Sequence, residues 1–396
     1  MIDSSITKKY FNKISKKTGH FQDLFIVLVT HIVQDREYLI KALTNVAEVG
    51  MIIPKPKSIQ KNELRELEKN YFFYKNYCKK KCKKDCLDHI IDRDYLDNNP
   101  TKVIDTIEEK ANGKDIIILD IGGYFVNIHN EIKDHFKERF IGIIEDTENG
   151  HQKYEKKIES SKTKIYSVAR SPLKIPEDYL VGLSICFSAE AVMREENEIL
   201  TGKIILVIGY GKIGSSIARH LSGKNNIVYI HDTDYLKLVE ASSHGFPILT
   251  KDSSLRKADV VFCATGNNAL ETKDAKYFKE NAMIFTSTSS DDELNFSANL
   301  SEYRFMKPVG KSGHLVCYSF EESKSFILCN KGEAVNFLHG ASVGNYIYLV
   351  QSEIVYGIKV LMENSHDFIE NTINEIDIND QRDIAQIWVE SFLNTD

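Results

Sequence analysis

Several features are scarce in this chain of 396 residues, and each scarcity excludes a class of protein. Seven prolines are too few for long proline-rich linkers, while 42% hydrophobic and 27% charged residues are typical of a globular protein. No apolar run approaches the roughly 18 residues of a membrane-spanning helix, and the polar N-terminal segment lacks the apolar core of a secretory signal. We therefore expect a cytoplasmic protein with no membrane partner.

Cysteine is also sparse, and its odd count of seven does not suit a framework of paired disulfides. Four cysteines in apolar or strand-like segments are predicted to be reduced core residues: Cys186, Cys263, Cys317 and Cys329. The other three, Cys78, Cys82 and Cys86, would line one stripe of a helix near His89. One straight helix cannot surround an ion tetrahedrally, so we favour a packed stripe and predict no metal.

The charge balance gives little reason to expect a nucleic acid as partner, because the formal net charge is −6. A lysine-rich stretch at 79–84 interrupts the cysteine stripe, but one cationic turn without clustered aromatic residues is a weak basis for nucleic-acid binding. If exposed, these lysines would lower the pKa of neighbouring thiols, so redox sensitivity stays open. We predict a small-molecule substrate and no nucleic-acid partner.

Short apolar runs alternate with amphipathic stretches from Asp23 onward, the pattern of a parallel sheet with crossover helices. A second series of such runs begins after Gly202, at the spacing of a doubly wound α/β fold. We therefore predict a doubly wound domain at residues 182–344. It would be inserted into a second α/β substrate domain made of residues 1–181 and 345–396.

A glycine motif marks a nucleotide-binding turn in the inserted domain. Gly209, Gly211 and Gly214 form G-x-G-x-x-G directly after an apolar strand, and Lys212 and Ile213 open the helix that follows. The first glycine permits the tight turn, the second lets backbone N–H groups approach a pyrophosphate, and the third lets the helix pack on the strand. The inserted domain is thus predicted to be a Rossmann dinucleotide-binding domain.

Other residues at the ends of strands indicate which dinucleotide binds. Asp232 ends the next strand about 20 residues on, where it can accept hydrogen bonds from both ribose hydroxyls of the adenosine half. A carboxylate there repels a 2′-phosphate, which favours NAD over NADP. Thr265, Gly266 and Asn267 follow a later strand, where the nicotinamide half normally lies. We predict NAD as the cofactor.

The order of these features resembles that in S-adenosylhomocysteine hydrolases. The shared order is an apolar strand, G-Y-G-x-x-G, an acid after the second strand, and T-G at a later strand end. Outside this domain, Asp120 begins a D-I-G-G segment similar to the family's D-D-G-G. Asp146 and Thr147 lie in E-D-T-E-N-G, which is similar to its E-E-T-T-T-G. The resemblance implies that these three residues bind the substrate.

The same resemblance implies a set of catalytic residues. Lys174 and Asp178 resemble the family's K-x-x-x-D, His31 follows a strand as in its L-H, and Asn336 lies in A-V-N, similar to L-V-N. In the family, NAD removes hydride from C3′ of a ribose, and loss of the C4′ proton then expels the 5′ substituent. Lys174, Asp178 and His31 would act on the alcohol and its protons across a cleft from the nicotinamide, and Asn336 would contact NAD. From the residues alone, a surface ion pair and a core histidine remain open.

Departures from the family pattern fall on residues that move protons or recognise the substrate. Ile121 replaces the second Asp of D-D-G-G and cannot transfer a proton. Ser289 stands where a histidine is expected, and Tyr179 replaces the Asn that follows the Asp of K-x-x-x-D. We therefore predict an NAD-dependent enzyme that oxidises a secondary alcohol of a nucleoside- or sugar-like substrate without the elimination step.

Two alternatives remain open at this point. One is a true S-adenosylhomocysteine hydrolase, and the other is an NAD-binding regulatory protein whose catalysis has decayed, which Ile121 and Ser289 permit. A 2-hydroxyacid dehydrogenase is disfavoured because its set of Arg, Glu and His is not found in the usual order. The resemblance also implies a homodimer or homotetramer.

Overall fold

The computed structural model describes residues 4–75, 90–288, 290–295, 304–309, 313–320, 324–363, 369 and 371–393. The chain divides into two compact units, one of Met1–Lys174 with Gly344–Asp396 and one of Ile175–Val343. The expected boundary after residue 181 falls inside α8 (Ile175–Glu195), at whose first residue the second unit begins. The second unit is thus one continuous segment, and the first is made of two.

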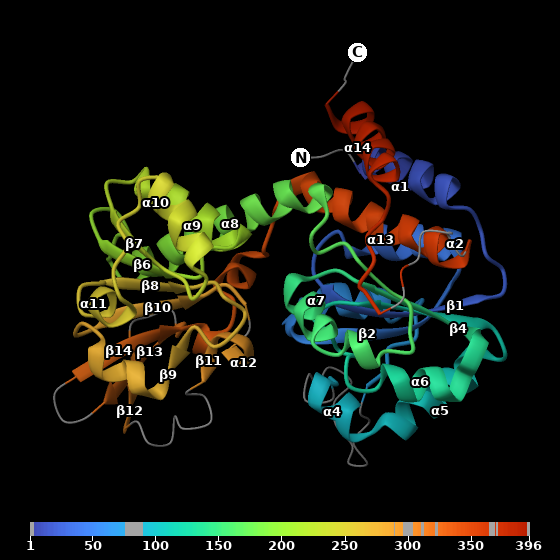
Figure 1. The fold of residues 1–396 in the computed structure, drawn as a ribbon, viewed down its shortest axis with the longest axis horizontal. Coiled ribbons are helices and arrows are strands. Elements are labelled where there is room, and N and C mark those ends of the chain that lie inside the picture. Colours follow the sequence, from blue (N-terminus) through green and yellow to red (C-terminus); the bar gives the residue numbers. More distant parts are fainter. Residues whose placement is uncertain are drawn as a thin grey trace. The chain divides into compact units, whose positions relative to one another are not determined.

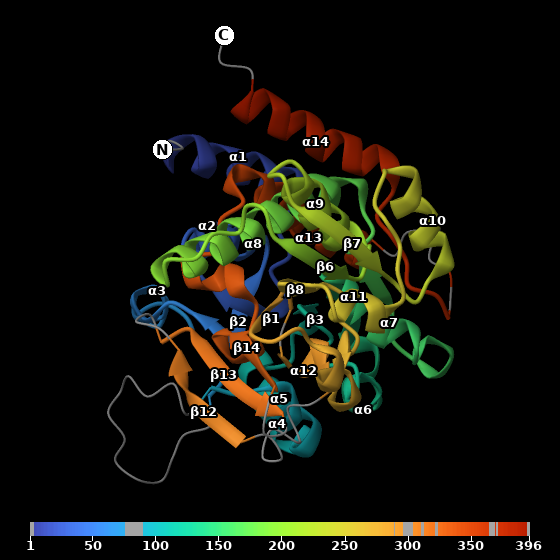
Figure 2. The same ribbon diagram turned by 90° about the vertical axis from the view of Figure 1, so that its left-hand side faces the viewer.

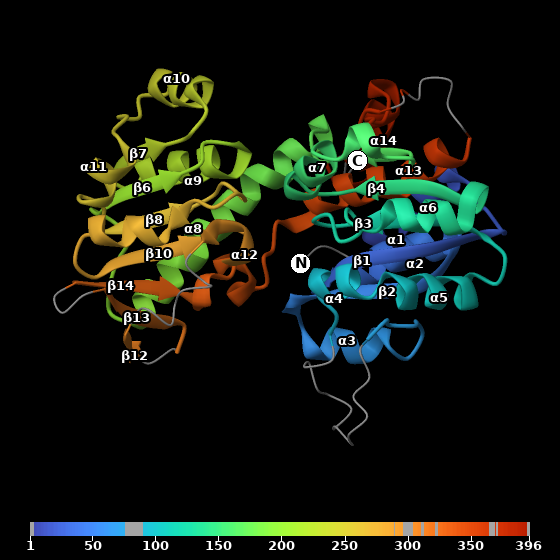
Figure 3. The same cartoon turned by 60° about the horizontal axis from the view of Figure 1, so that its bottom comes forward.

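The first unit is built on a parallel sheet, which has five strands in the described part of the chain (Figure 3). Its strands are β1 (Leu24–Ile32), β2 (Glu48–Ile59), β3 (Asp115–Asp120), β4 (Phe140–Glu145) and β5 (Ile165–Ser167). Their order is β2-β1-β3-β4-β5, and all neighbours are parallel. The chain leaves β1 in one direction and β3 in the other. The topological switch point therefore lies between β1 and β3, where doubly wound sheets bind ligands beyond the carboxyl ends of the strands.

Helices cover both faces of this sheet because successive strand residues point to opposite faces. One face carries α1 (Ser4–Thr18), α2 (Arg36–Val46), α13 (Ile347–Met362) and α14 (Ile378–Phe392), and the other carries α5 (Pro100–Ala111), α6 (His129–Phe136) and α7 (Glu148–Glu155) (Figure 1). In β1, Ile26 packs with the first group and Val27 with the second. Two shorter helices of this unit are α3 (Lys61–Leu67) and α4 (Arg93–Asn98).

The segment after residue 344 completes the core of the first unit. The hydroxyl of Tyr10 in α1 donates to the carbonyl of Tyr348 at 3.3 Å and accepts from the hydroxyl of Ser352 at 2.7 Å. Tyr348 and Ser352 both belong to α13, and both are buried. Residues more than 300 positions apart in the chain therefore share one side of the sheet.

The second unit contains a sheet with the order β12-β13-β14-β10-β8-β6-β7 in the residues that the structure describes (Figure 2). The parallel strands are β6 (Ile204–Ile208), β7 (Ile227–His231), β8 (Val260–Cys263), β10 (Ala282–Thr286) and β14 (Lys324–Cys329). An antiparallel extension is formed by β12 (Arg304–Val309) and β13 (Leu315–Phe320). A separate pair of short strands consists of β9 (Leu270–Glu271) and β11 (Leu294–Asn295).

The second unit is doubly wound, and the predicted α/β class with a Rossmann domain is confirmed. Helices α8 and α9 (Lys212–Ser222) pack on one face of the sheet, and α11 (Lys251–Leu255) packs on the other. The remaining helices are α10 (Tyr235–Ser243) and α12 (Ser290–Glu293). From β6 the chain passes to β7 on one side and later to β8 on the other, so the switch point lies between β6 and β8.

The cysteines only partly match their prediction. Cys186, Cys263 and Cys329 are buried and free, whereas Cys317 is half-buried in the antiparallel extension. Cys78, Cys82, Cys86 and His89 lie outside the described residues. Among the helices described, none has the length and apolar character needed to cross a bilayer.

Candidate functional site

The glycine turn between β6 and α9 has the shape that a dinucleotide requires. Gly209 has a φ of +95°, and a Cβ atom built on it would lie 2.5 Å from the carbonyl oxygen of Ala264. A Cβ atom on Gly214 would lie 1.9 Å from the carbonyl oxygen of Gly209, so helix and strand end are in direct contact. A Cβ atom on Gly211, by contrast, would meet no described atom within 4 Å. Gly211 is the N-cap of α9, and open space at a helix N-terminus suits a pyrophosphate.

Asp232, predicted to bind the adenosine ribose, also anchors this turn. Its carboxylate accepts from the backbone N–H of Tyr210 at 2.6 Å and of Asp234 at 2.9 Å. Each carboxylate oxygen keeps a second lone pair, so these contacts are compatible with hydrogen bonds from ribose hydroxyls. The anchoring role was not apparent from the sequence.

The loop after β8 lies against the glycine turn. Cγ2 of Thr265 is 3.0 Å from the position of a Cβ atom on Gly209. Within the loop, the N–H of the exposed Asn267 donates to the hydroxyl of Thr265 at 2.9 Å. Thr265, Gly266 and Asn267 therefore border the switch point, as their position after a strand predicts.

Among the buried polar atoms of this unit that have no hydrogen-bond partner in the described residues are Oδ1 of Asn336 and Oγ of Ser287. Asn336 lies in the 3₁₀ turn Val335–His339, and Ser287 directly follows β10. A buried polar atom without a partner costs free energy, which a ligand can recover. The open space at Gly211 and the side chain of Asn336 fit NAD, with Asn336 as a candidate partner of the carboxamide.

In the first unit, His31 lies near the end of β1, at the switch point. Its Nδ1 is hydrogen-bonded to the hydroxyl of Ser58. Burial lowers the pKa of His31 well below its usual value, and the positive charges of Lys55, Arg36 and Lys174 lower it further. The imidazole is therefore neutral at physiological pH.

Lys174 and Asp178 each have a charged partner that their spacing did not predict. Nζ of Lys174, in a side chain that is 8% exposed, lies 3.2 Å from Oδ1 of Asp146. Asp178 lies in α8, and its Oδ2 is 3.5 Å from Nζ of Lys212. Lys174 and Asp146 thus form a nearly buried ion pair at the carboxyl edge of the first sheet. Lys212, predicted to bind the cofactor, holds Asp178 in the second unit, and the adjacent Ile213 lies in the first turn of α9.

Asp120 is placed differently from the expectation that it binds substrate. It is 1% exposed, and its carboxylate accepts from the N–H groups of Tyr124 and Phe125, both at 3.0 Å. The hydroxyl of the buried Tyr154 donates a third hydrogen bond at 2.6 Å. This placement favours a structural role for Asp120, which fixes the turn that follows β3.

Glu145, opposite Asp120 in the register of β3 and β4, holds the same turn. It accepts from the N–H groups of Gly122 at 2.9 Å and Gly123 at 3.1 Å. The hydroxyl of Thr147 also donates to it at 2.7 Å, so this predicted substrate contact is used within the protein. Burial and the charge of Asp120 raise the pKa of Glu145 to about 8.

Two lysines flank the glycine pair after β3. Nζ of Lys55 donates to the carbonyl of Ile121 at 3.1 Å, and Nζ of Lys153 donates to that of Gly122 at 3.2 Å. Ile121 itself is buried in the core and has no group that can transfer a proton. With Lys174 nearby on the same sheet edge, this region carries several positive charges.

Glu353 is a buried acid whose position the sequence did not reveal, because α13 has the composition of an apolar core helix. Its Oε1 accepts from Nε2 of Gln381 at 2.9 Å, and its Oε2 has no hydrogen-bond partner within the described ranges. Burial raises the pKa of Glu353 to about 7, while Ser171, Gln381 and the charge of Lys174 oppose the rise. Glu353 therefore belongs to the electrostatic surroundings of Lys174.

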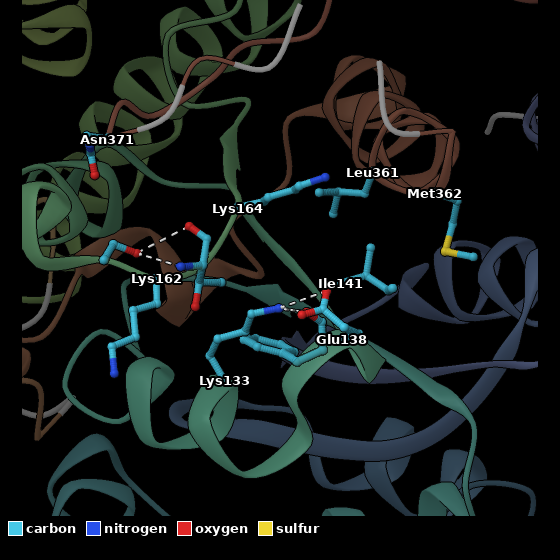
Figure 4. Close-up of a pocket in the computed structure, with 11 residues that line it drawn as sticks. Lys133, Glu138, Ile141, Lys162, Lys164, Leu361, Met362 and Asn371 are labelled. Atoms are coloured by element: carbon cyan, nitrogen blue, oxygen red, sulfur yellow. Dashed lines mark hydrogen bonds and ion pairs between the residues drawn. The ribbon is translucent and has the colours of Figure 1, made fainter. Parts of the chain in front are cut away.

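A pocket of about 390 Å³ lies at the other edge of the first sheet (Figure 4). It is lined by Lys133, Glu138, Phe140, Ile141, Ser161, Lys162, Thr163, Lys164, Leu361, Met362 and Asn371. Phe140 and Ile141 begin β4, so this pocket is at the amino ends of the strands and contains none of the predicted site residues. Of the departures from the family pattern, Tyr179 is 46% exposed, and Ser289 lies outside the described residues.

Comparison with known proteins agrees with the geometry of the second unit. Residues 185–343 match the family described as S-adenosyl-L-homocysteine hydrolase, NAD binding domain. An S-inosyl-L-homocysteine hydrolase from Methanopyrus kandleri is 26% identical over 231 residues, which cover 57% of this chain and 53% of that protein. An adenosylhomocysteinase from Thermotoga maritima is 25% identical over 256 residues, covering 62% and 61%. The matches thus span only part of the length of these relatives.

The solved structures that match this chain are less alike in sequence. A glyoxylate reductase from Paecilomyes thermophila is 11% identical, covers 88% of this chain and 98% of its own, and has a TM-score of 0.43. A phosphoglycerate oxidoreductase from Vibrio cholerae is 10% identical, covers 86% and 99%, and has a TM-score of 0.46. From the family match and these relatives, the second unit is an NAD-binding domain of the S-adenosylhomocysteine hydrolase type, and the cofactor is NAD.

Proposed function

We propose that the protein is an NAD-dependent enzyme that oxidises a secondary alcohol of a nucleoside- or sugar-like substrate. The observation that carries the proposal is that the chain has both an open dinucleotide turn at Gly211 in the second unit and, at the switch point of the first, a neutral His31 and a nearly buried Lys174. NAD, when bound, accepts a hydride from the carbinol carbon. The residues of the first unit would then bind the substrate and handle its proton.

Lys174 is the leading candidate for the group that acts on the reacting hydroxyl. Its pairing with Asp146 holds the ammonium in one place, from which it can donate a hydrogen bond to the substrate oxygen. His31 is neutral and carries an acceptor lone pair on its ring, so it can take a proton. Asp178 would act through Lys212, its charged partner, and thus as a positioning residue.

The charges around this edge also bear on the substrate. Lys55 and Lys153 favour a neutral or anionic substrate over a cationic one, whereas the charge of Lys174 is balanced by Asp146. Ile121 places an apolar side chain where the family pattern has an acid, which supports the loss of the elimination step. A homodimer or homotetramer remains a prediction from the family resemblance.

The second candidate function is hydrolysis of an S-nucleosyl-homocysteine. It is favoured by the names of two relatives, an S-inosyl-L-homocysteine hydrolase and an adenosylhomocysteinase. Purified protein with saturating NAD would be mixed with S-adenosylhomocysteine or S-inosylhomocysteine, and released thiol would be measured. Thiol release would establish this candidate, whereas NADH formation without thiol would support oxidation alone. Absence of both with these compounds, adenosine, inosine and a panel of sugars would leave a regulatory NAD-binding protein.

The proposed role of Lys174 is tested with Lys174→Met. We expect the rate of NADH formation in a single turnover to fall by roughly 10²–10⁴-fold, the usual size of an acid–base contribution, with NAD affinity retained. Lys162→Met is the matched control, because the Lys162 side chain is 58% exposed and pairs with Asp134 far from the carboxyl edge. An unchanged rate in Lys174→Met would rule out the proposed role.

A further inference from the structure

Glu293 is a buried acid near the glycine turn, and it has no part in the roles described above for the glycine motif and Asp232. It ends α12, directly before β11, and its side chain is fully buried. Its carboxylate accepts from the N–H of Thr265 at 3.2 Å, the N–H of Gly266 at 2.9 Å and the hydroxyl of Thr265 at 2.8 Å. The hydroxyl of Thr288 donates a fourth hydrogen bond at 3.0 Å.

These bonds join two loops at the carboxyl edge of the sheet. Thr265 and Gly266 follow β8, while Thr288 and Glu293 follow β10, the neighbouring strand. A second link is the hydrogen bond from the N–H of Asn268 to the carbonyl of Asp292 at 2.7 Å. The conformation of the loop after β8 therefore depends on an acid that is 28 residues further along the chain.

The loop that Glu293 holds is one wall of the glycine turn. The N–H of Ala264 donates to the carbonyl of Ile208 at 2.8 Å, and the carbonyl of Ala264 is the closest obstacle to a side chain at Gly209. A shift of Thr265 would move this wall, because Ala264 and Thr265 are adjacent. Glu293 is thus connected to the glycine turn through Thr265 and Ala264.

The charge of Glu293 adds a second effect. Burial raises the pKa of Glu293, while hydrogen bonds from Gly266, Thr265 and Thr288 favour its ionised form and oppose the rise. A negative charge inside a protein acts over longer distances than one in water, because less solvent screens it. Oxidised nicotinamide carries a positive charge that reduced nicotinamide lacks, so a nearby carboxylate stabilises the oxidised form selectively.

We infer that Glu293 is a positioning residue that holds the loop after β8 against the glycine turn and, through its negative charge, makes the domain bind NAD⁺ more tightly than NADH. The inference goes beyond the proposed oxidation and requires only that NAD binds. Its test needs no substrate, so its failure is distinguishable from failure of the proposed function.

The test uses Glu293→Gln in the full-length protein. Glutamine keeps the size of the side chain, removes the charge and turns an NH₂ group towards backbone N–H donors. Dissociation constants for NAD⁺ and NADH are measured separately by calorimetry on nucleotide-free protein. We expect NAD⁺ affinity to fall on the order of tenfold and NADH affinity to fall less, so that the preference for NAD⁺ shrinks. Equal losses, or no loss, overturn the inference.

Two further variants separate charge from structure. Glu293→Asp keeps the charge while shortening the side chain. It should lower the affinity for both NAD⁺ and NADH yet preserve the preference for NAD⁺. Asp259→Asn is the matched control: its carboxylate also accepts from a backbone N–H, that of Ile204 at 2.8 Å, but at the amino edge of the same sheet. This control should leave the ratio of the two dissociation constants unchanged, and a shift equal to that of Glu293→Gln refutes a local effect.

The wild-type protein provides a measurement that does not depend on whether Glu293→Gln folds. Wild type should bind NAD⁺ more tightly than NADH. Tighter binding of NADH by wild type overturns the inference directly. Circular dichroism and thermal midpoints of each variant establish that the compared proteins are folded.

Discussion

Gly211 and Gly214 lie three residues apart in one turn, yet the structure predicts opposite outcomes when each receives a side chain. Gly211 has φ −74° and ψ −163°, which any residue adopts, and the space beside it is open. Gly214 faces the carbonyl oxygen of Gly209. We expect Gly211→Val to fold and lose NAD, and Gly214→Ala to lose folding stability.

The size of each effect follows from the geometry. A Cβ atom on Gly214 would lie 1.9 Å from a backbone oxygen, whereas real Cβ contacts are not shorter than 3.0 Å, so the helix and the strand must move apart. Overpacking of this kind costs about 1–3 kcal/mol, equivalent to roughly 2–12 °C in thermal midpoint for a unit of this size. The valine side chain in Gly211→Val keeps the backbone N–H groups away from the pyrophosphate. Losing one or two charge-assisted hydrogen bonds lowers the affinity for NAD by roughly 10²-fold.

Thermal denaturation with and without NAD distinguishes the two variants. At an NAD concentration of about 100 times the dissociation constant, wild type should gain about 2.7 kcal/mol by linkage. Gly211→Val should keep the midpoint of the NAD-free protein but lose this gain. Gly214→Ala should begin from a lower midpoint. The reasoning fails if Gly211→Val keeps the full NAD-dependent gain, or if both variants lower the NAD-free midpoint equally.

Two other predictions concern buried or anchoring acids. Asp232→Ala should weaken NAD by about 1–3 kcal/mol and also lower the thermal midpoint, because its carboxylate accepts from Tyr210 and Asp234; tighter binding of NADP than NAD by wild type would contradict its assignment. Glu353 has a pKa raised from 4.5 to about 7 in the folded state, so the unfolded chain releases its proton first and stability falls as pH rises from 4.5 to 7. When the free energy of unfolding is measured by urea denaturation across this pH range, it should fall less steeply with pH in Glu353→Gln than in wild type. An equal dependence on pH in the two proteins would refute the argument.

The glycine turn was predictable because its residue types are imposed by local backbone geometry. Gly209 needs a positive φ, and Gly214 needs the absence of a side chain at a strand end. A strand, a glycine turn and a helix in succession leave little freedom in how the segment folds. Asp232 could be placed at the end of β7 for the same reason, since its distance from the turn is fixed by one helix and one strand.

Contacts between distant segments could not be predicted. The ion pair of Lys174 with Asp146 joins residues 28 positions apart, and Glu293 reaches Thr265 over the same separation. Such pairs depend on which loops meet at a sheet edge, and the sequence suggested only a surface ion pair for Lys174 and Asp178. Asp120 illustrates the same limit, because the motif predicted its residue type but not its burial or its hydrogen bonds with Tyr124 and Phe125.

The unit boundary illustrates a further limit of sequence patterns. The prediction placed it after residue 181, whereas α8 runs without interruption from Ile175 to Glu195. The whole of this helix belongs to the second unit, so its backbone hydrogen bonding continues without a break past residue 181. Only the packing of its residues shows where the second unit begins.

The division of the first unit into two segments has a consequence for the order of synthesis. The ribosome finishes the whole second unit, Ile175–Val343, before it makes the helix that Tyr10 contacts in the first. Until α13 and α14 emerge, that side of the sheet has only α1 and α2 of the four helices described on it, and the core residues that α13 covers lie open. The N-terminal segment of the first unit therefore has an incomplete core that is prone to aggregation during this time. The second unit, made later, already has all of its residues and can fold.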